Sequence, residues 1–465
     1  MDTLPMEVVE VIALHLTARD LAACCSTNHA WRDMFGQDII WKHHCNRAVA
    51  ECLATAESRV EPKFVLPENK DVANSLSPLG KWRLAYLREQ LLWSHWINGK
   101  KLMETLAIND PHKQKLIPSE DGLCEFVTND YLITSCEKQV MLWNISSSPV
   151  YVSDPFRLLL PGRVTFYSSI DNNKIVIVQK TVVQIYHYGS PMKPNWTLEQ
   201  SFLFDRATPV QFSETQEMET FPLTFSCLVI ENYFVGILSS GEIHVWNLQS
   251  GTKLKKVLCP GINNDKIIKV VNSRNPKKDF VITVRRNNMY HFYVFSLASL
   301  EFYPFNTSHD LQRFPSCVIQ NGLLATCLKN SFKVFDYHSS QLILVVPSDY
   351  SVGLLTIDDY FLLITRSTIH VFHTITRAFE SVLMPLLNPL ESIHSFNDIA
   401  CSKFLITGHY SGEIGWEIDL KSIPIKITHL RKLVYQFYFN CAINKACTKL
   451  AEIVWDEHVN IISLW

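Results

Sequence analysis

The chain has 465 residues, of which 47% are hydrophobic, 11% aromatic and 19% charged, and its formal net charge is -2. This length accommodates one small module and one large domain, and the hydrophobic content is enough for a large packed core. A nearly neutral chain without a long basic run is not expected to bind nucleic acid, because duplex binders usually carry a strongly basic face.

The 13 cysteines follow no regular spacing, and no apolar stretch reaches the length of a membrane span. The N-terminus carries Asp2, Glu7 and Glu10, not the basic and then apolar run of a secretory signal. We therefore expect an intracellular protein, cytoplasmic or nuclear or both, with reduced thiols and no membrane partner. The run from Lys42 to Cys45 has no second ligand pair at zinc-finger spacing, so it predicts a helix end and not a metal site.

The segment from Leu4 to Trp41 predicts three short helices. Pro5 suits the first turn of a helix, and the aliphatic residues after it recur at helical spacing as one apolar stripe. Thr17 and Asp20 predict the cap of a second helix carrying Leu21, Cys24, Cys25 and Asn28, and Ile39 to Trp41 predict a third short turn. So few residues cannot bury the whole stripe and two tryptophans, and the surplus apolar surface implies a partner.

This segment resembles an F-box. The positions that carry the resemblance are Leu4, Pro5, Glu7, Val8, Val9, Ile12, Leu16, Asp20, Leu21, Trp31, Ile40 and Trp41. It departs from the family at Cys24-Cys25, where aliphatic residues are usual, and at Asn28-His29, where a basic pair is frequent. The alternative is an ordinary amphipathic helical hairpin within a larger core.

The F-box resemblance implies that the segment binds a Skp-type adaptor. The residues it assigns to adaptor binding are Leu4, Pro5, Val8, Val9, Ile12, Leu16, Leu21, Trp31 and Trp41. We expect seven of them to be partly exposed in the isolated chain, namely Val8, Val9, Ile12, Leu16, Leu21, Trp31 and Trp41. After this module, residues 53–78 predict an irregular surface connection and residues 79–96 a helix. The joint from Lys81 to Lys100 resembles the joint of F-box/WD-repeat proteins.

From about residue 97 onwards the chain repeats a pattern of short apolar strands with a period of about 45 residues, within the range of propeller blades. The clearest unit, 233–248, is similar to a WD40 repeat with Trp246-Asn247 in place of Trp-Asp. Eight third strands are expected, at residues 140–144, 183–186, 243–247, 291–295, 332–336, 369–372, 413–417 and 459–464. No unit has the family's Gly-His pair, and Trp-Asp occurs only at Trp455-Asp456, outside the expected place.

These patterns predict a multidomain chain: a small all-α F-box and linker helices, then an all-β, WD40-like propeller with eight blades favoured and seven possible. The expected boundaries are 1–45 for the F-box, 46–96 for a helical and irregular linker, and 97–465 for the propeller. We expect the strand at 100–108 to pair with the last strand and so to remove an open sheet edge.

No sequence signature of an enzyme is present, so we expect no catalytic residue, cofactor or metal. Turns between second and third strands instead repeat basic residues, and Arg163 precedes a first strand. The candidate set is Arg163, Lys180, Arg286, Arg366, Lys138 and Lys329. One interpretation is a basic ring that receives an acidic or phosphorylated segment, and the other is ordinary surface charge on exposed turns.

The family resemblance implies a non-catalytic substrate receptor of a Skp–cullin–F-box ubiquitin ligase. The F-box would hold the Skp adaptor and, through it, a cullin–RING ligase, while the propeller would hold a target protein. The alternative is a scaffold or trafficking protein that binds the adaptor without the cullin.

Overall fold

The fold is described from a computed structural model. The residues it describes are 4–54, 60, 80–107, 124–136, 139–146, 156–159, 166–171, 174–179, 182–188, 196–203, 224–238, 240–260, 266–272, 279–286, 289–305, 307–310, 316–328, 331–347, 351–365, 368–383, 400–401, 404–409, 412–420, 424–435, 441–444, 446–454 and 458–465. The chain divides into two compact units. One contains Met1–Leu132, Trp143–Asp154 and Tyr438–Trp465, and the other contains Ile133–Leu142 and Pro155–Phe437.

The N-terminal part of the chain is helical. Its helices are α1 (Met6–Leu14), α2 (Ala18–Thr27), α3 (His29–Phe35), α4 (Asp38–Lys42), α5 (Arg47–Leu53) and α6 (Lys81–Asn98). Four helices, not three, therefore lie between Leu4 and Trp41. The additional one is α3, which begins where the side chain of Asn28 accepts a hydrogen bond from the Trp31 N–H. Most of the predicted irregular connection, 53–78, lies outside the described residues.

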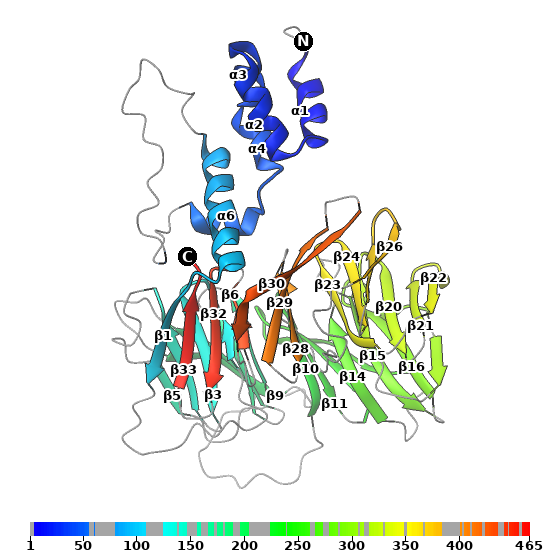
Figure 1. The fold of residues 1–465 in the computed structure, drawn as a ribbon. Helices are drawn as coiled ribbons and strands as arrows, with labels where there is room; N and C mark the ends of the chain where they lie inside the picture. The colour runs from blue at the N-terminus through cyan, green and yellow to red at the C-terminus, as the bar shows by residue number, and fades with distance from the viewer. Residues whose placement is uncertain are drawn as a thin grey trace. The chain divides into compact units, whose positions relative to one another are not determined.

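Helix α6 runs two residues beyond the predicted end, because Gly99 in the left-handed conformation (φ 64°) terminates it. The rest of the chain is a succession of antiparallel sheets, and eight are present among the described residues (Figure 1).

The first four sheets along the chain take their strands in sequence order. They contain β2 (Cys124–Phe126), β3 (Tyr131–Cys136), β4 (Gln139–Asn144) and β5 (Phe156–Leu159); then β6 (Phe166–Asp171), β7 (Lys174–Gln179), β8 (Val182–Tyr188) and β9 (Trp196–Leu203); then β10 (Thr224–Ile230), β11 (Tyr233–Leu238), β12 (Glu242–Asn247) and β13 (Thr252–Leu258); then β14 (Lys266–Asn272), β15 (Asp279–Arg286), β16 (Met289–Ser296), β17 (Glu301–Phe302) and β18 (Thr307–Asp310). In the last of these, β17 and β18 both pair with β16.

The next three sheets repeat this order. They contain β19 (Ser316–Gln320), β20 (Leu323–Leu328), β21 (Ser331–Asp336) and β22 (Gln341–Pro347); then β23 (Ser351–Ile357), β24 (Tyr360–Thr365), β25 (Thr368–His373) and β26 (Phe379–Leu383); then β27 (Ala400–Cys401), β28 (Phe404–His409), β29 (Gly412–Asp419) and β30 (Lys426–Tyr435). Each third strand coincides with a strand predicted from the repeat pattern.

The final sheet, called here the closing sheet, joins the two ends of the chain. Its order is β1 (Leu102–Ala107), β33 (His458–Ser463), β32 (Lys449–Val454) and β31 (Cys441–Ile443). The antiparallel register sets Leu102 opposite Ser463 and Ala107 opposite His458. The predicted pairing of the N-terminal strand with the last strand is therefore confirmed, and Figure 1 shows β1 beside β33.

Neighbouring sheets pack as the blades of a β-propeller do. The first strands β6, β10, β14, β19 and β23 contact one another in succession. Consecutive sheets share buried apolar clusters; one of them brings Val235 and Ile243 against Phe280 and Phe295. The all-β part of the predicted fold is thus observed as many small sheets in propeller order. The number of blades and the predicted domain boundaries stay predictions, and Trp455-Asp456 lies outside the described residues.

The polar residue that ends a third strand closes the turn that follows it. The side chain of Asn247 accepts hydrogen bonds from the N–H groups of Gln249 and Ser250, at 2.8 and 3.1 Å. Asp336 does the same for His338 and Ser339, at 3.0 and 3.1 Å. A turn closed by the side chain of its first residue explains why this position is polar where Trp-Asp would stand in a WD40 repeat.

Candidate functional site

The first four helices enclose a small apolar core. Its buried members are Val9, Ala13, Leu21, Cys25, Phe35, Ile40 and Trp41. The Trp41 indole N–H donates to the Phe35 carbonyl at 3.2 Å, so the largest side chain of this core is also hydrogen-bonded. These residues hold the module together and are not free to meet a partner.

The cap of α2 forms as predicted. Thr17 Oγ1 accepts from the Asp20 N–H at 3.2 Å, and the Asp20 carboxylate accepts from both the Thr17 N–H and the Thr17 hydroxyl, at 3.0 and 2.7 Å. The hydrogen bonds from Thr17 hold the pKa of Asp20 below its usual value. This reciprocal capping box fixes where α2 begins and how the chain leaves α1.

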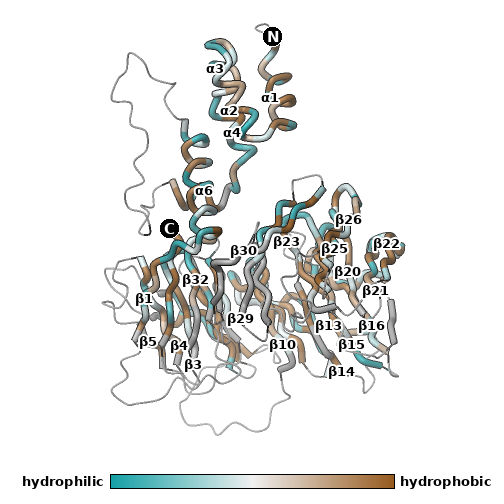
Figure 2. The backbone as a smooth tube through the Cα atoms, in the orientation of Figure 1, coloured by the Kyte–Doolittle hydropathy of each residue, from teal (hydrophilic) through white to brown (hydrophobic). Residues whose placement is uncertain are grey.

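One side of α1 is apolar and open to solvent. Val8, Val11 and Leu14 are 41%, 57% and 54% exposed, and α1 is among the most hydrophobic helices of the N-terminal part (Figure 2). Since residues three apart fall on the same side of a helix, these three side chains form one continuous strip, called here the α1 strip. Exposed aliphatic residues grouped in this way are typical of interaction surfaces.

Two members of the α1 strip, Val11 and Leu14, were not among the predicted adaptor-binding residues. The F-box pattern picks out positions that recur across a family, and it does not separate the inner side of the helix from the outer side. The helical angle of 100° per residue does make that separation, because Val8, Val11 and Leu14 lie on the opposite side from the buried Val9 and Ala13.

The expected exposure is wrong for three of the seven residues. Val9, Leu21 and Trp41 are at most 3% exposed because they form the core of the helical module. Of the assigned adaptor-binding residues, Pro5 and Val8 are exposed, while Leu4, Ile12, Leu16 and Trp31 are half-buried. Trp31 packs on Phe35 with 5.6 Å between the ring centres, so one side of its indole is occupied.

Helix α4 caps helix α6 from outside. The Asp38 carboxylate accepts from the Trp82 and Arg83 N–H groups at 2.7 and 3.3 Å, in the first turn of α6. Gly80 is required beside it, because any side chain there would collide with the Asp38 carboxylate. The joint is completed by the Arg83 guanidinium, which lies 5.3 Å from the Trp41 ring centre.

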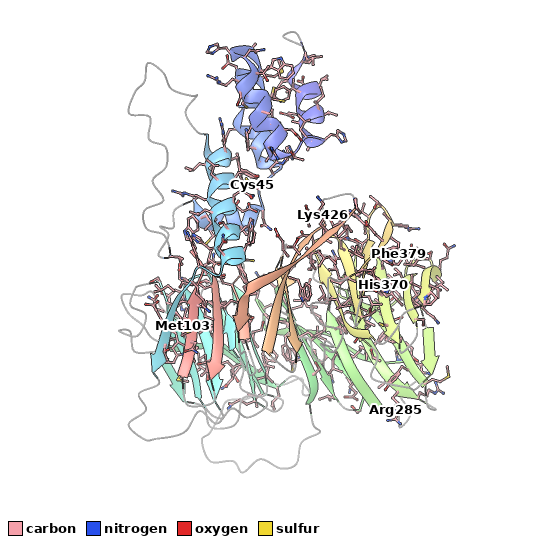
Figure 3. The ribbon with its side chains drawn as sticks, in the orientation of Figure 1. Cys45, Met103, Arg285, His370, Phe379 and Lys426 are labelled. Atoms are coloured by element: carbon pink, nitrogen blue, oxygen red, sulfur yellow. The ribbon has the colours of Figure 1, made fainter. Side chains whose placement is uncertain are left out.

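Helix α5 is fixed to α6 by a buried carboxylate. Glu89, 3% exposed, accepts from the Asn46 N–H at 2.8 Å and from the Trp93 indole N–H at 3.0 Å. The Cys45 thiol donates to the carbonyls of Trp41 and Trp82 at 3.4 and 3.3 Å, and Figure 3 labels it on the segment between α4 and α5. The run from Lys42 to Cys45 is therefore a structural joint.

The C-terminal half of α6 docks on the closing sheet. The buried His95 donates through Nδ1 to the Leu464 carbonyl at 2.8 Å, and the Trp96 indole N–H donates to the Cys447 carbonyl at 2.9 Å. Both side chains are 0% exposed. Because α6 also holds α4 and α5, the helical module and the closing sheet are joined through one helix.

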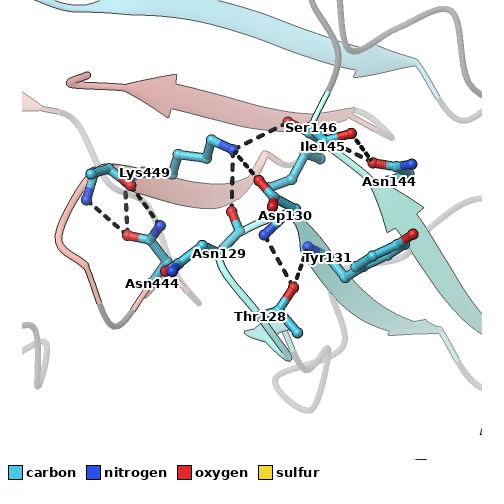
Figure 4. Close-up of polar contacts among 10 residues, drawn as sticks. Thr128, Asn129, Asp130, Tyr131, Asn144, Ile145, Ser146, Asn444 and Lys449 are labelled. Carbon is cyan, nitrogen blue, oxygen red and sulfur yellow. Dashed lines mark hydrogen bonds and ion pairs between the residues drawn. The ribbon is translucent and has the colours of Figure 1, made fainter. Parts of the chain in front are cut away.

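Lys449 links the closing sheet to the first sheet. Its ammonium group, with the residue 9% exposed, donates to the Asn129 and Ile145 carbonyls at 3.1 and 3.2 Å and lies 3.3 Å from the Asp130 carboxylate (Figure 4). Asn444 fixes the preceding turn by accepting from the Thr448 and Lys449 N–H groups. A buried ammonium needs such donor–acceptor pairs, and this one has three.

Other neighbouring sheets are linked at the same strand positions. Tyr337 donates to Asp279 at 2.7 Å, and burial together with this hydrogen bond raises the pKa of Tyr337, so it stays a neutral donor. Tyr360 donates to the Leu420 carbonyl at 3.1 Å. Asp279, Tyr360 and Lys449 are each the first residue of a second strand. Their partners Tyr337, Leu420 and Ile145 are each the residue directly after a third strand. These links tie the neighbouring sheets together through polar contacts.

The predicted basic ring falls mostly outside the described residues. Arg163, Lys180, Arg366, Lys138 and Lys329 all lie there. Arg286 is described; it is exposed and is the last residue of β15. The basic ring therefore stays a prediction. In the part of the chain that the structure describes, no three His, Cys, Asp or Glu side chains come together as a metal site requires.

A family model described as F-box-like matches residues 1–47, the segment that holds α1 to α4 and their core. Residues 1–47 form an F-box-like domain. F-box domains generally bind Skp-type adaptors, and this domain of the chain is therefore expected to act in protein–protein interaction. Among the described residues, no helix is both long enough and apolar enough to cross a membrane.

A comparison with curated protein sequences found no match. Among solved structures, the chain is similar to the computationally designed Ika8 protein, with 12% identity, coverage of 75% of this chain and 99% of that chain, and a TM-score of 0.48. It is also similar to BamB from Moraxella catarrhalis, with 10% identity, coverage of 78% and 99%, and a TM-score of 0.44.

Proposed function

We propose that this F-box protein is a substrate receptor of a Skp–cullin–F-box ubiquitin ligase. The observation that carries the proposal is the α1 strip: Val8, Val11 and Leu14 stand exposed on an F-box-like domain whose core is already filled by other residues. A Skp-type adaptor would cover this strip, and a cullin–RING ligase would be recruited through the adaptor.

The mechanism we propose is proximity without catalysis by this chain. The adaptor-bound helices, tied through α6 to the closing sheet, would hold a target protein near a charged ubiquitin-conjugating enzyme brought by the cullin. Holding two reactants together can supply a large part of a rate enhancement. The setting would be cytoplasmic, nuclear or both.

The first test is adaptor capture by co-purification from cells. Replacing Val8, Val11 and Leu14 together by serine removes apolar contact area while the module core stays intact, so adaptor recovery should fall at least tenfold. The matched control is Met103→Ser, which changes an equally exposed apolar residue on β1 (58% exposed) and should leave recovery unchanged. Undiminished adaptor recovery with the triple variant would remove the α1 strip from the interface.

Cullin co-purification separates the proposed function from its alternative. A receptor recovers the cullin with the adaptor, and a cullin-independent scaffold recovers the adaptor alone.

We also propose that the basic ring receives the target. In that case Arg286→Glu and Arg366→Glu should lower capture of a target while adaptor recovery and the melting temperature stay near wild type, and rising salt should weaken capture.

A further inference from the structure

The outermost strand β26 presents a row of side chains that the fold leaves open. Phe379, Ser381 and Leu383 lie on one face of β26, and Arg377 stands in the turn just before it; we call these four residues the β26 row. Leu383 is 78% exposed and Phe379 37% exposed. Phe379 stacks on the imidazole of His370 with 6.0 Å between ring centres, and His370 Nδ1 lies 2.8 Å from the Ser381 hydroxyl. Figure 3 labels His370 and Phe379. These contacts fix the row on one side of the sheet.

That side faces the neighbouring β19–β22 sheet. Phe379 pairs across the strands with Phe372, and Phe372 belongs to the buried cluster that also contains Phe332 and Val334 of the neighbour. On the neighbour's outer strand β22, Ile343, Leu344 and Val346 are only partly buried against the same cluster. At the outer strands, the contact between the two sheets, called here a seam, is therefore lined by apolar side chains from both sheets.

At two other seams, the outer strands of neighbouring sheets make polar contacts instead. The Lys255 ammonium lies 3.5 Å from the Glu301 carboxylate, between β13 and β17. On the opposite side of the β23–β26 sheet, Glu380 accepts from the Ile425 N–H at 3.1 Å. Beside the β26 row, a polar contact lies at the turn end, where the Arg377 guanidinium is 3.5 Å from Asp336 Oδ2. Phe379 and Leu383 extend beyond that contact.

Arg377 occupies a backbone position that favours glycine. Its φ is 61°, and its N–H donates to the carbonyl four residues earlier, as the N–H of Gly251 does with φ 63°. The arginine side chain is 55% exposed, and Asp336 Oδ1 is already used by the turn N–H groups of His338 and Ser339. A guanidinium has five N–H donors, so most of them face solvent beside the apolar row.

We propose that the β26 row docks a segment of a partner protein in which a carboxylate residue is followed by alternating apolar residues. The carboxylate would take paired hydrogen bonds from Arg377, a geometry that arginine provides and lysine does not. The apolar residues would cover Phe379 and Leu383, which lie about 13 Å apart along an extended strand. Arginine is also one of the residue types enriched at interface hot spots.

This docking surface is separate from the α1 strip and does not depend on the ubiquitin-ligase proposal. It can be tested on the purified full chain with two fluorescent synthetic peptides. One begins with aspartate and continues with alternating leucine and serine, and the other has lysine in place of the aspartate. Fluorescence anisotropy should show that the acidic peptide binds wild type at least tenfold more tightly than the basic peptide.

Charge reversal provides the decisive comparison. Arg377→Glu should invert the preference between the two peptides, and Leu383→Ser should weaken both at least fivefold. Arg377→Gly suits the left-handed backbone, so it keeps the fold and should abolish the preference. Arg285→Glu, at an exposed arginine on β15, should behave as wild type.

Equal binding of the two peptides to wild type would overturn the proposal, as would an unchanged preference in Arg377→Glu. Sedimentation velocity of the full chain distinguishes another occupant. Concentration-dependent dimerisation that Leu383→Ser abolishes would assign the β26 row to a second copy of this chain, and the partner segment would then be wrong.

Discussion

In three of the described sheets, a residue with a left-handed backbone stands directly before the fourth strand. Gly251 has φ 63°, while Leu300 and Ser340 both have φ 56°. Glycine adopts this conformation without penalty, whereas a residue with a Cβ atom is strained by about 1–2 kcal/mol. The regular position shows that the turn geometry, and not the side chain, dictates the backbone here.

Ser340→Gly should stabilise the protein by about 0.5–1 kcal/mol, because relief of the left-handed strain exceeds the added entropy of the unfolded chain. Ser339→Gly is the matched control: Ser339 is an exposed neighbour in the same turn whose φ is not positive, so this change should destabilise slightly. Thermal unfolding of both variants measures the difference. A lower melting temperature for Ser340→Gly would show that the left-handed residue is not strained.

Neighbouring residues of α1 show what sequence can and cannot predict at this scale. The apolar spacing correctly predicted a helix, but it placed Val8 and Val9 in one stripe. In the structure Val9 is buried and Val8 is exposed, because 100° of helical rotation separates them. Which of two adjacent valines faces the core depends on where α3 and α4 pack, and that information is not local.

At the scale of elements, helix α6 contacts α4, α5 and the closing sheet. Its first turn is capped by Asp38, its middle holds the N-terminus of α5 through Glu89, and its end docks on the closing sheet through His95 and Trp96. The sequence predicted the helix from its apolar period. It could not predict the Asp38 cap, because the capping residue lies more than 40 positions away from the helix that it caps.

Asp38→Ala should loosen the joint between α4 and α6. The N–H groups of Trp82 and Arg83 lose their acceptor, and the first turn of α6 then keeps Lys81 and Arg83 near the positive end of the helix dipole. We expect a loss of about 1–2 kcal/mol, the range for removing a helix cap. Hydrogen exchange should show faster exchange in the first turn of α6.

The control for this change is Asp33→Ala, at an exposed acid on α3, which should leave exchange in α6 unaltered. If Asp38→Ala also leaves it unaltered, water replaces the carboxylate without loss and the cap has no role in the joint.

The α3 helix itself illustrates the limit of pattern reading. Its seven residues are too few for a clear period, so only the cap at Asn28 signals it.

Among the described residues, three pairs of sheets are joined by the same positional rule. The first residue of a second strand contacts the residue that follows the neighbour's third strand, as Asp279 does with Tyr337 and Tyr360 with Leu420. Lys449 of the closing sheet contacts Ile145 of the first sheet in the same way. The contact of Lys449 with Ile145 therefore repeats the contact that two internal pairs of sheets make, which the repeat period alone could not establish.

The last prediction concerns β1, which pairs with β33 in the closing sheet. Strand β33 lies between β1 and β32, and its Val459, Ile461 and Ile462 are at most 1% exposed. Deleting residues 1–110 removes β1 and leaves β33 with an unpaired apolar edge, which is a template for association with other chains. The shortened chain should aggregate, as measured by light scattering during size-exclusion chromatography.

A second deletion isolates the contribution of β1 from that of the F-box-like domain. Removing only residues 1–79 keeps α6 and β1, so His95, Trp96 and the β1–β33 pairing remain in place. This protein should stay monomeric and unfold cooperatively, although it has lost α1 to α5. A monomeric and cooperative chain after the longer deletion would mean that the closing sheet is stable with three strands, and that the N-terminal strand serves only to hold α6 in position.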